Sequence, residues 1–228
     1  MKILTTLTIL PSIFANNSTL LQPSTRKLSL IFQMLSNEVE TNLGFVEFTK
    51  NIRNYGCHCF PQNSGAAGGF GPAQDPIDQH CQNLARCHKC IEMDYENEIE
   101  ATWDADIGKY KYSIGADGIV DCSGNREQKR EDLCECDKRF AIELGKTYTD
   151  SMWNDFFWLG EKENTGKFQY EAVCVRGTGI RNNKCCGSYP GRFPYDDSMK
   201  SCCADTTVFN EAFQECCASG LVAPAGTC

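Results

Sequence analysis

Cysteine is the residue type that most constrains this chain, because 16 of its 228 residues are cysteine. A large, even number of cysteines is typical of a protein that folds in an oxidising compartment and pairs its thiols as disulfides. The chain opens with one lysine and a short apolar run that ends near Ala15. We therefore expect residues 1–15 to be a signal peptide and the mature protein to be secreted into the extracellular space.

The charge of the chain narrows the classes of partner. A formal net charge of -8 argues against nucleic acid and against electrostatic capture by anionic membranes, both of which require basic surfaces. After the leader, no apolar stretch is long enough to span a bilayer, so we expect no transmembrane anchor. Cations, basic proteins and mineral surfaces are the electrostatically favoured partners. Asn16 and Asn17 begin two overlapping glycosylation motifs.

Hydrophobic periodicity predicts a mainly α-helical first part. Apolar residues recur at helical spacing over residues 26–55 with a break near Gly44, which predicts one helix and a shorter second one. Residues 78 to about 98 and 129 to about 144 predict two long helices that cysteines can staple antiparallel. Between them, alternation over residues 109–114 before an Asp-Gly turn predicts a small β-hairpin.

The composition changes after about residue 160. Cysteines now come in adjacent pairs, separated by glycine, proline and aromatic residues, without a helical period. They are Cys174, Cys185-Cys186, Cys202-Cys203, Cys216-Cys217 and Cys228. We expect residues 161–228 to form a small, irregular cysteine-rich module in which each doublet bonds to two different neighbours and makes a compact knot.

Four aromatic residues precede this module: Trp153, Phe156, Phe157 and Trp158. We expect them to pack the joint between the two parts, the alternative being an exposed patch for lipid or a partner.

Three separated motifs point to a family. Residues 55–59 read Tyr-Gly-Cys-His-Cys before a glycine-rich loop, residues 78–87 read Asp-Gln-His-Cys-Gln-Asn-Leu-Ala-Arg-Cys, and residues 134–137 read Cys-Glu-Cys-Asp. In this order and spacing they resemble the secreted phospholipase A2 family over roughly residues 28–144. The resemblance implies a disulfide-rich fold in residues 16–160 with two long antiparallel helices, a calcium-type loop and a small hairpin. The later cysteine doublets resemble galaxin-like proteins of extracellular and calcified matrices.

The chemistry of that family depends on a histidine base and a neighbouring aspartate that binds calcium. Here Leu84 and Ala85 occupy the two positions. Leucine cannot accept a proton, and a calcium loop reduced to carbonyl oxygens near His58 and Phe60 lacks its charged ligand. We therefore expect no catalytic residue, no bound metal and no cofactor, the alternative being weak calcium binding at this remnant loop.

Two histidines on the same predicted helix were considered as replacement bases. His80 and His88 lie one turn to either side of Leu84, and a turn displaces a side chain by about 5.4 Å, too far for the same water. We expect His88 to pack where the family often has an aromatic residue. Asp137 matches the aspartate that orients the family's histidine, and it is expected either to bond Tyr110 or Tyr112 or to be solvated.

The family resemblance also implies a disulfide pattern. The implied pairs are Cys59–Cys81, Cys87–Cys136 and Cys122–Cys134. One further family bridge is missing at both ends, where His80 and Glu143 stand instead. Cys57 is left to pair with Cys90 or with Cys174.

These features together predict a secreted, catalytically inactive phospholipase A2-like protein that binds extracellular matrix and is associated with mineral. One alternative is a divergent calcium-dependent phospholipase A2 that hydrolyses the sn-2 ester. Another is a non-enzymatic homologue that binds lipid or a receptor in an apolar pocket around Leu84. Apolar lining at Leu28, Ile31 and Phe48 would favour that pocket, whereas a filled space would favour the inactive binding protein.

Overall fold

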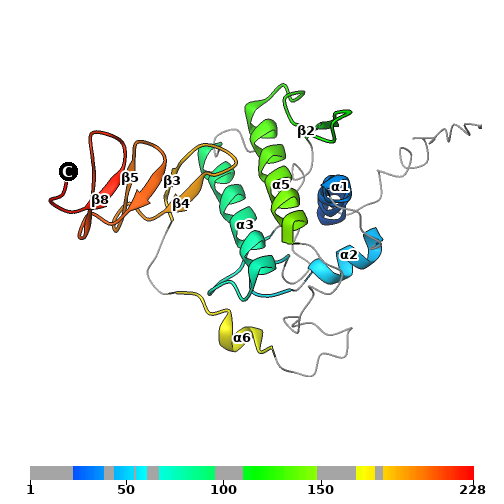
Figure 1. The fold of residues 1–228 in the computed structure, drawn as a ribbon. Helices are drawn as coiled ribbons and strands as arrows, with labels where there is room; N and C mark the ends of the chain where they lie inside the picture. Colours follow the sequence, from blue (N-terminus) through cyan, green and yellow to red (C-terminus); the bar gives the residue numbers. More distant parts are fainter. Residues whose placement is uncertain are drawn as a thin grey trace, which may run out of the picture.

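The computed structural model describes residues 23–38, 44–53, 55–60, 67–95, 110–147, 168–177 and 182–228. Helices between residues 23 and 147 form one part, here called the helical unit, and residues 182–228 form a row of small hairpins, here called the ladder (Figure 1). The expected signal peptide, Asn16, Asn17, the aromatic residues at 153–158 and the boundary at residue 160 lie outside the described residues. No helix among the described residues is both long and apolar enough to cross a membrane.

The helical unit begins with α1 (Pro23–Glu38) and α2 (Phe45–Ile52). The second helix starts directly after Gly44, where the periodicity breaks. Helix α3 (Pro76–Asp94) starts two residues before the predicted position, because Pro76 suits the first turn of a helix and the Asp75 carboxylate accepts the Asp78 N–H at 2.8 Å.

Helices α3 and α5 (Gln128–Thr147) pack against each other and run antiparallel. Their contacts show the direction: His80 faces Glu143 near one end, Cys87 bonds Cys136 in the middle, and Tyr95 donates to Asp132 at the other end. Helix α5 extends beyond the predicted residues 129–144 at both ends. Helix α3 ends at Asp94, short of the predicted residue 98.

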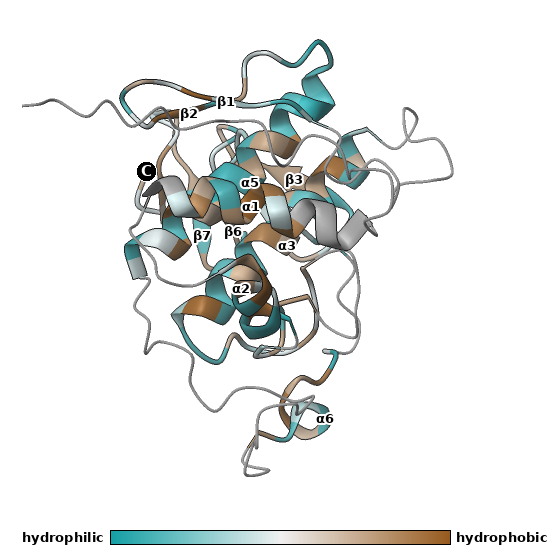
Figure 2. Ribbon diagram, turned by 90° about the vertical axis from the view of Figure 1, so that its right-hand side faces the viewer, coloured by the Kyte–Doolittle hydropathy of each residue, from teal (hydrophilic) through white to brown (hydrophobic). Residues whose placement is uncertain are grey.

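The core lies where α1, α2, α3 and α5 meet, and Figure 2 shows hydrophobic residues of these helices gathered in the middle of the molecule. Its largest fully buried side chains are Tyr55, Phe48, Phe60, Phe140, Leu28, Ile31, Met34, Leu35, Ile52, Ile91 and Leu144. Strands β1 (Ser113–Ile114) and β2 (Val120–Asp121) form the predicted hairpin beside them, with Ile114 opposite Val120.

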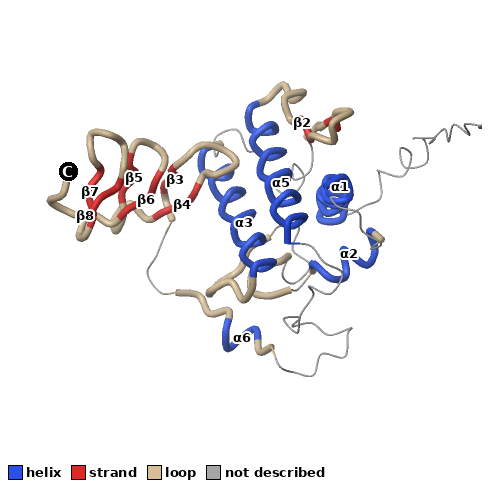
Figure 3. Tube along the Cα trace, in the orientation of Figure 1, coloured by secondary structure: helices blue, strands red, loops and turns tan. Residues whose placement is uncertain are grey.

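The ladder consists of three antiparallel hairpins, which Figure 3 shows as successive pairs of short strands. The pairs are β3 (Lys184–Cys186) with β4 (Phe193–Tyr195), β5 (Ser201–Cys203) with β6 (Thr207–Phe209), and β7 (Gln214–Cys216) with β8 (Val222–Pro224). The expectation of an irregular module was therefore wrong. Strands of three residues are too short to show a period-two pattern in the sequence.

All sixteen cysteines are paired, in eight disulfides. The helical unit holds Cys59–Cys81, Cys87–Cys136 and Cys122–Cys134, the three pairs that the family resemblance implies. The ladder holds Cys186–Cys202, Cys203–Cys216 and Cys217–Cys228. Each doublet bonds to two different neighbours. The hairpins that these bonds join lie in a row that leads away from α3 and do not form the expected compact knot (Figure 1).

Two disulfides cross between distant parts of the chain. Cys57 bonds Cys174, which follows the short helix α6 (Tyr170–Val173), and Cys90 on α3 bonds Cys185 on β3. A Cys57–Cys90 bond, one of the two alternatives, is therefore absent. Cys174 also does not belong to the ladder, where its place in the series of cysteines had suggested it.

Candidate functional site

A buried hydrogen-bond network joins α3 to α5 at the level of Asp137. The carboxylate of Asp137 is fully buried and contacts His88 Nε2 at 2.9 Å through one oxygen and the Tyr110 hydroxyl at 2.7 Å through the other. Burial, followed by the adjacent Asp137 carboxylate, raises the pKa of Tyr110 well above its usual value, so the phenol remains a hydrogen-bond donor. Of the alternatives for Asp137, the bond to Tyr110 is present, whereas Tyr112 donates to Gln33 and Asp137 is not solvated.

The sequence does not predict the contact between His88 and Asp137. It predicts His88 as a packing residue and excludes it as a replacement base at the position of Leu84. A usable signal existed, because the expected disulfide between the preceding residues, Cys87 and Cys136, sets the two helices in the register that brings His88 to Asp137.

The side chains at positions 84 and 85 have no acid–base chemistry. Leu84 is 2% exposed within the core, and Ala85 is partly buried on the next position of α3. His80 lies a turn away and faces α5, where its Nδ1 is 3.5 Å from Glu143. Burial lowers the pKa of His80. His80 and Glu143 thus meet at the two positions where the family resemblance implies a disulfide.

The loop before α3 is anchored by a buried carboxylate. Asp78 accepts hydrogen bonds from the backbone N–H groups of Cys57, His58 and Gln74, at 2.9, 2.7 and 3.0 Å. Gly56 has a φ of +56°, and a Cβ there would lie 2.2 Å from the Asp78 carboxyl carbon. Only glycine fits this position, which explains the Tyr-Gly-Cys sequence. Burial raises the pKa of Asp78 although its three N–H donors oppose this.

The oxygen positions that the family resemblance assigns to calcium are only partly preserved. The carbonyl of His58 accepts the Gly68 N–H at 2.8 Å, so this oxygen is engaged within the loop. A Cβ built on Gly68 would lie 3.6 Å from Ala85 Cβ, which places the loop directly against the residue that lacks a carboxylate. Phe60 has a φ of +45° and a fully buried ring, although an L-residue adopts this backbone at some energetic cost.

Two uncharged groups contact the ring nitrogen Nε2 of His58. Its Nε2 lies 2.9 Å from the side-chain nitrogen of Gln82 and 3.1 Å from the carbonyl oxygen of Gly71. Burial lowers the pKa of His58, outweighing the nearby Asp78 carboxylate, which raises it.

Comparison with known proteins shows similarity to phospholipases A2. The chain is 32% identical over 97 residues to a phospholipase A2 of Calliactis polypus, covering 42% of this chain and 52% of that protein. It is 33% identical over 88 residues to the group IID secretory phospholipase A2 of Mus musculus, covering 39% of this chain and 51% of that protein. About two-fifths of the chain is similar in sequence to secreted phospholipases A2.

The similarity is confined to part of each protein, because the chain spans about half the length of the first of these relatives. An acidic phospholipase A2 of Naja naja is 28% identical over 105 residues, 46% of this chain and 77% of that protein. No family model matches the chain.

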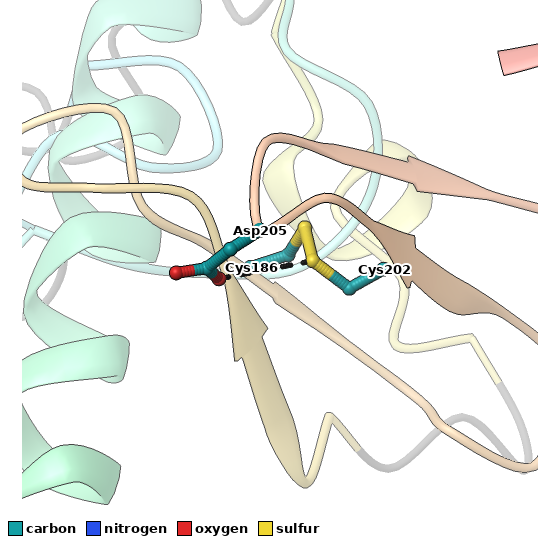
Figure 4. A group of neighbouring side chains, drawn as sticks. All are labelled: Cys186, Cys202 and Asp205. Carbon is teal, nitrogen blue, oxygen red and sulfur yellow. Dashed lines mark hydrogen bonds between the residues drawn. A yellow bond between two sulfur atoms is a disulfide. The ribbon is translucent and has the colours of Figure 1, made fainter. Parts of the chain in front are cut away.

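One further cluster, in the ladder, consists of residue types that can bind metals. Cys186, Cys202 and Asp205 lie within ligand distance of one another, as Figure 4 shows. The two sulfur atoms form a disulfide, and metal binding by cysteine requires the thiolate. The carboxylate of Asp205 instead accepts the Gly187 N–H at 3.4 Å. The cluster is therefore a joint between two hairpins.

Proposed function

We propose that this chain is a secreted, non-hydrolytic relative of phospholipase A2 that acts as an extracellular binding protein. The observation that carries this proposal is the state of the buried Asp137. The carboxylate that would orient a catalytic histidine is already bonded to His88 and Tyr110, while the position of that histidine is occupied by Leu84.

General-base catalysis needs a titratable group within hydrogen-bond reach of the attacking water. His88 is 4% exposed, and its Nε2 is engaged by Asp137. His80 faces Glu143 on α5. Neither histidine replaces the missing base at Leu84.

Calcium binding at the loop is disfavoured for an independent reason. Calcium prefers six to eight oxygen ligands, with carboxylates supplying the charge that offsets its dehydration. Ala85 supplies no oxygen, and Phe60 and His58 contribute only backbone carbonyls. We infer weak calcium binding or none at this loop.

The packing around Leu84 favours a binding protein with a solid core over one with a lipid pocket. Leu28, Ile31 and Phe48, the side chains expected to line such a pocket, are all fully buried. The space beside Leu84 that also touches His80 and Phe140 measures about 10 Å³, which is scarcely the volume needed for one water molecule. A phospholipid chain would have to displace core side chains to enter here.

We infer that the partner is a component of the extracellular matrix or a calcified surface, and that it is bound through the outside of the molecule. A net charge of -8 favours cationic partners. The expected resemblance of the ladder to galaxin-like proteins supports the same class of partner.

A divergent hydrolase is the second candidate, and one observation favours it. His88 and Asp137 form a histidine–carboxylate pair, the arrangement that general-base catalysis uses, one helical turn from the family position. This candidate requires His88 to become accessible to water and substrate.

Hydrolysis of mixed phospholipid vesicles in millimolar calcium separates the two candidates. We expect the purified protein to release no fatty acid above a vesicle-only control. Turnover that a chelator abolishes would overturn the proposal, and loss of that turnover in His88→Gln would establish the divergent hydrolase. Binding is tested in parallel by sedimentation with calcium carbonate particles, and we expect retention that falls as ionic strength rises.

A further inference from the structure

The ladder has an odd number of cysteines. Residues 182–228 contain Cys185, Cys186, Cys202, Cys203, Cys216, Cys217 and Cys228, which are seven. Seven thiols cannot all pair among themselves, so one partner must come from elsewhere. That partner is Cys90 on α3, which bonds Cys185.

The bond from Cys90 has the same direction as those within the ladder. In Cys186–Cys202 and Cys203–Cys216, the second cysteine of one doublet bonds the first cysteine of the next. Cys90 likewise bonds the first cysteine of a doublet. In the series of disulfides, helix α3 therefore takes the place that a preceding hairpin would take.

The contacts around Cys90 form a stripe along α3. Arg86, Cys90 and Asp94 are spaced four residues apart and so share one face of the helix, separate from the stripe that enters the core. The guanidinium of Arg86 stacks over the ring of Phe193 on β4 at 4.6 Å. This face thus meets the first hairpin on both sides of the disulfide.

Asp94 makes the most specific contact of the stripe. Its carboxylate accepts hydrogen bonds from Arg192 Nε at 2.5 Å, from Arg192 Nη2 at 3.2 Å and from the Tyr189 hydroxyl at 2.8 Å. A two-point contact between guanidinium and carboxylate fixes orientation as well as distance. Both groups are partly buried, with 21% of Arg192 and 27% of Asp94 exposed.

The second hairpin contacts the first hairpin through the same two residue types that α3 uses, a cysteine and an aspartate. On its other side, Arg192 lies 3.7 Å from Asp205, which is close in sequence to Cys202, the partner of Cys186. Each neighbour of the first hairpin thus presents a cysteine and an aspartate to it: Cys90 and Asp94 from α3, and Cys202 and Asp205 from the second hairpin.

We propose that the Arg86–Cys90–Asp94 face of α3 is a docking site for a cysteine-doublet hairpin, and that it sets the pairing of the first doublet of the ladder by selecting Cys185 over the adjacent Cys186. The selection matters because the two cysteines differ by one residue in the chain. If Cys90 took Cys186, then Cys202 would have to bond Cys185, which would change how the first hairpin is joined both to α3 and to the second hairpin. The helical unit therefore has a structural function that does not depend on hydrolysis.

Oxidative refolding of the reduced full-length protein tests this selection. Oxidised glutathione accepts the electrons, so that each protein disulfide forms as one glutathione disulfide is reduced to two thiols. We compare the wild type with Asp94→Asn, and use Glu92→Gln as the matched control, because Glu92 lies on the same helix and pairs with Lys89. Peptide mass spectrometry then gives the ratio of Cys90–Cys185 to Cys90–Cys186.

In Asp94→Asn we expect this ratio to fall by roughly tenfold, the effect of losing about one charge-assisted hydrogen bond, with no change in Glu92→Gln. The pairs Cys59–Cys81 and Cys122–Cys134 serve as an internal control that the helical unit has folded. An unchanged ratio in Asp94→Asn, with those helical pairs intact, would overturn the proposal.

A second pair of variants, Cys90→Ala with and without Asp94→Asn, leaves the ladder with one unpaired thiol whose position can be mapped by alkylation. We expect the label on Cys185 in the single variant and on both Cys185 and Cys186 in the double variant, because only the double variant has lost the Asp94 contact that sets the register. Label on Cys185 alone in both variants, with the three ladder pairs native, would show that the ladder sets its own register and would overturn the proposal. The result is independent of any hydrolytic or matrix-binding activity.

Discussion

The imidazole Nε2 of His88 lies 2.9 Å from a carboxylate oxygen of Asp137 in the buried contact between α3 and α5. With Tyr110 on the other oxygen, the pair satisfies a carboxylate that is fully removed from solvent. This network keeps an acidic residue in the core by giving each of its carboxylate oxygens a hydrogen-bond partner.

Replacing His88 by alanine should destabilise the fold. The change removes a hydrogen bond to a fully buried carboxylate, which costs about 2–4 kcal/mol of unfolding free energy. Denaturant unfolding without reductant measures this cost. His88→Tyr should recover part of the loss, because the phenol can still donate, whereas an alanine variant as stable as the wild type would refute a structural role for the pair.

Ala85→Asp should raise the affinity of the loop for calcium. The substitution returns a charged oxygen ligand next to Gly68, and we expect at least a tenfold gain over the wild type by calorimetric titration. Ala85→Asn is the matched control, since it adds an oxygen without the charge. Equal affinities in all three proteins would show that the loop carbonyls cannot converge on a cation. Hydrolysis should still be absent, because Leu84 remains.

His58 should contribute to acid sensitivity. Burial lowers its pKa below the usual 6.5, so the folded state favours the neutral ring. The corresponding stability is present above pH 6.5 and is lost as the pH falls from there through the lowered folded-state pKa. His58→Gln should reduce the slope of unfolding free energy by up to about 1.4 kcal/mol per pH unit in that window. Asp78 is present in both proteins, and a variant with an unchanged slope would contradict the assignment to His58.

Limited reduction should open the ladder before the helical unit. Cys216 and Cys228 are exposed, whereas Cys59 and Cys81 are buried, and a thiol reductant must reach the sulfur it attacks. We expect alkylation first at the outer ladder cysteines, while circular dichroism retains the helical signal. Early labelling of Cys59 or Cys81 would contradict this order.

The sequence predicted those features that local periodicity encodes. The break at Gly44, the long helices and the hairpin beside Ile114 follow from apolar spacing and turn residues. The three-residue strands of the ladder were missed, because Phe193-Pro194-Tyr195 carries a proline and no alternation. The partner of Cys57 could not be chosen, since Cys174 lies 117 residues away and no local pattern links them.

The sequence likewise predicted some features of the candidate site and missed others. The sequence predicted Leu84 and Ala85 on the first long helix and Asp137 on the second, and they lie on α3 and α5. It did not reveal that His88 bonds Asp137 or that the ring of Phe60 is buried at a positive φ, since both depend on how side chains fill the space between elements.

The head-to-tail order of the ladder bonds also bears on how such chains can change in length. Adding or deleting one whole hairpin changes the number of cysteines by two, so no thiol is left unpaired. The neighbouring hairpins then still bond through the second cysteine of one doublet and the first cysteine of the next. An arm of this kind can lengthen or shorten during evolution by duplication or loss of single hairpins, while the helical end to which it is fastened stays the same.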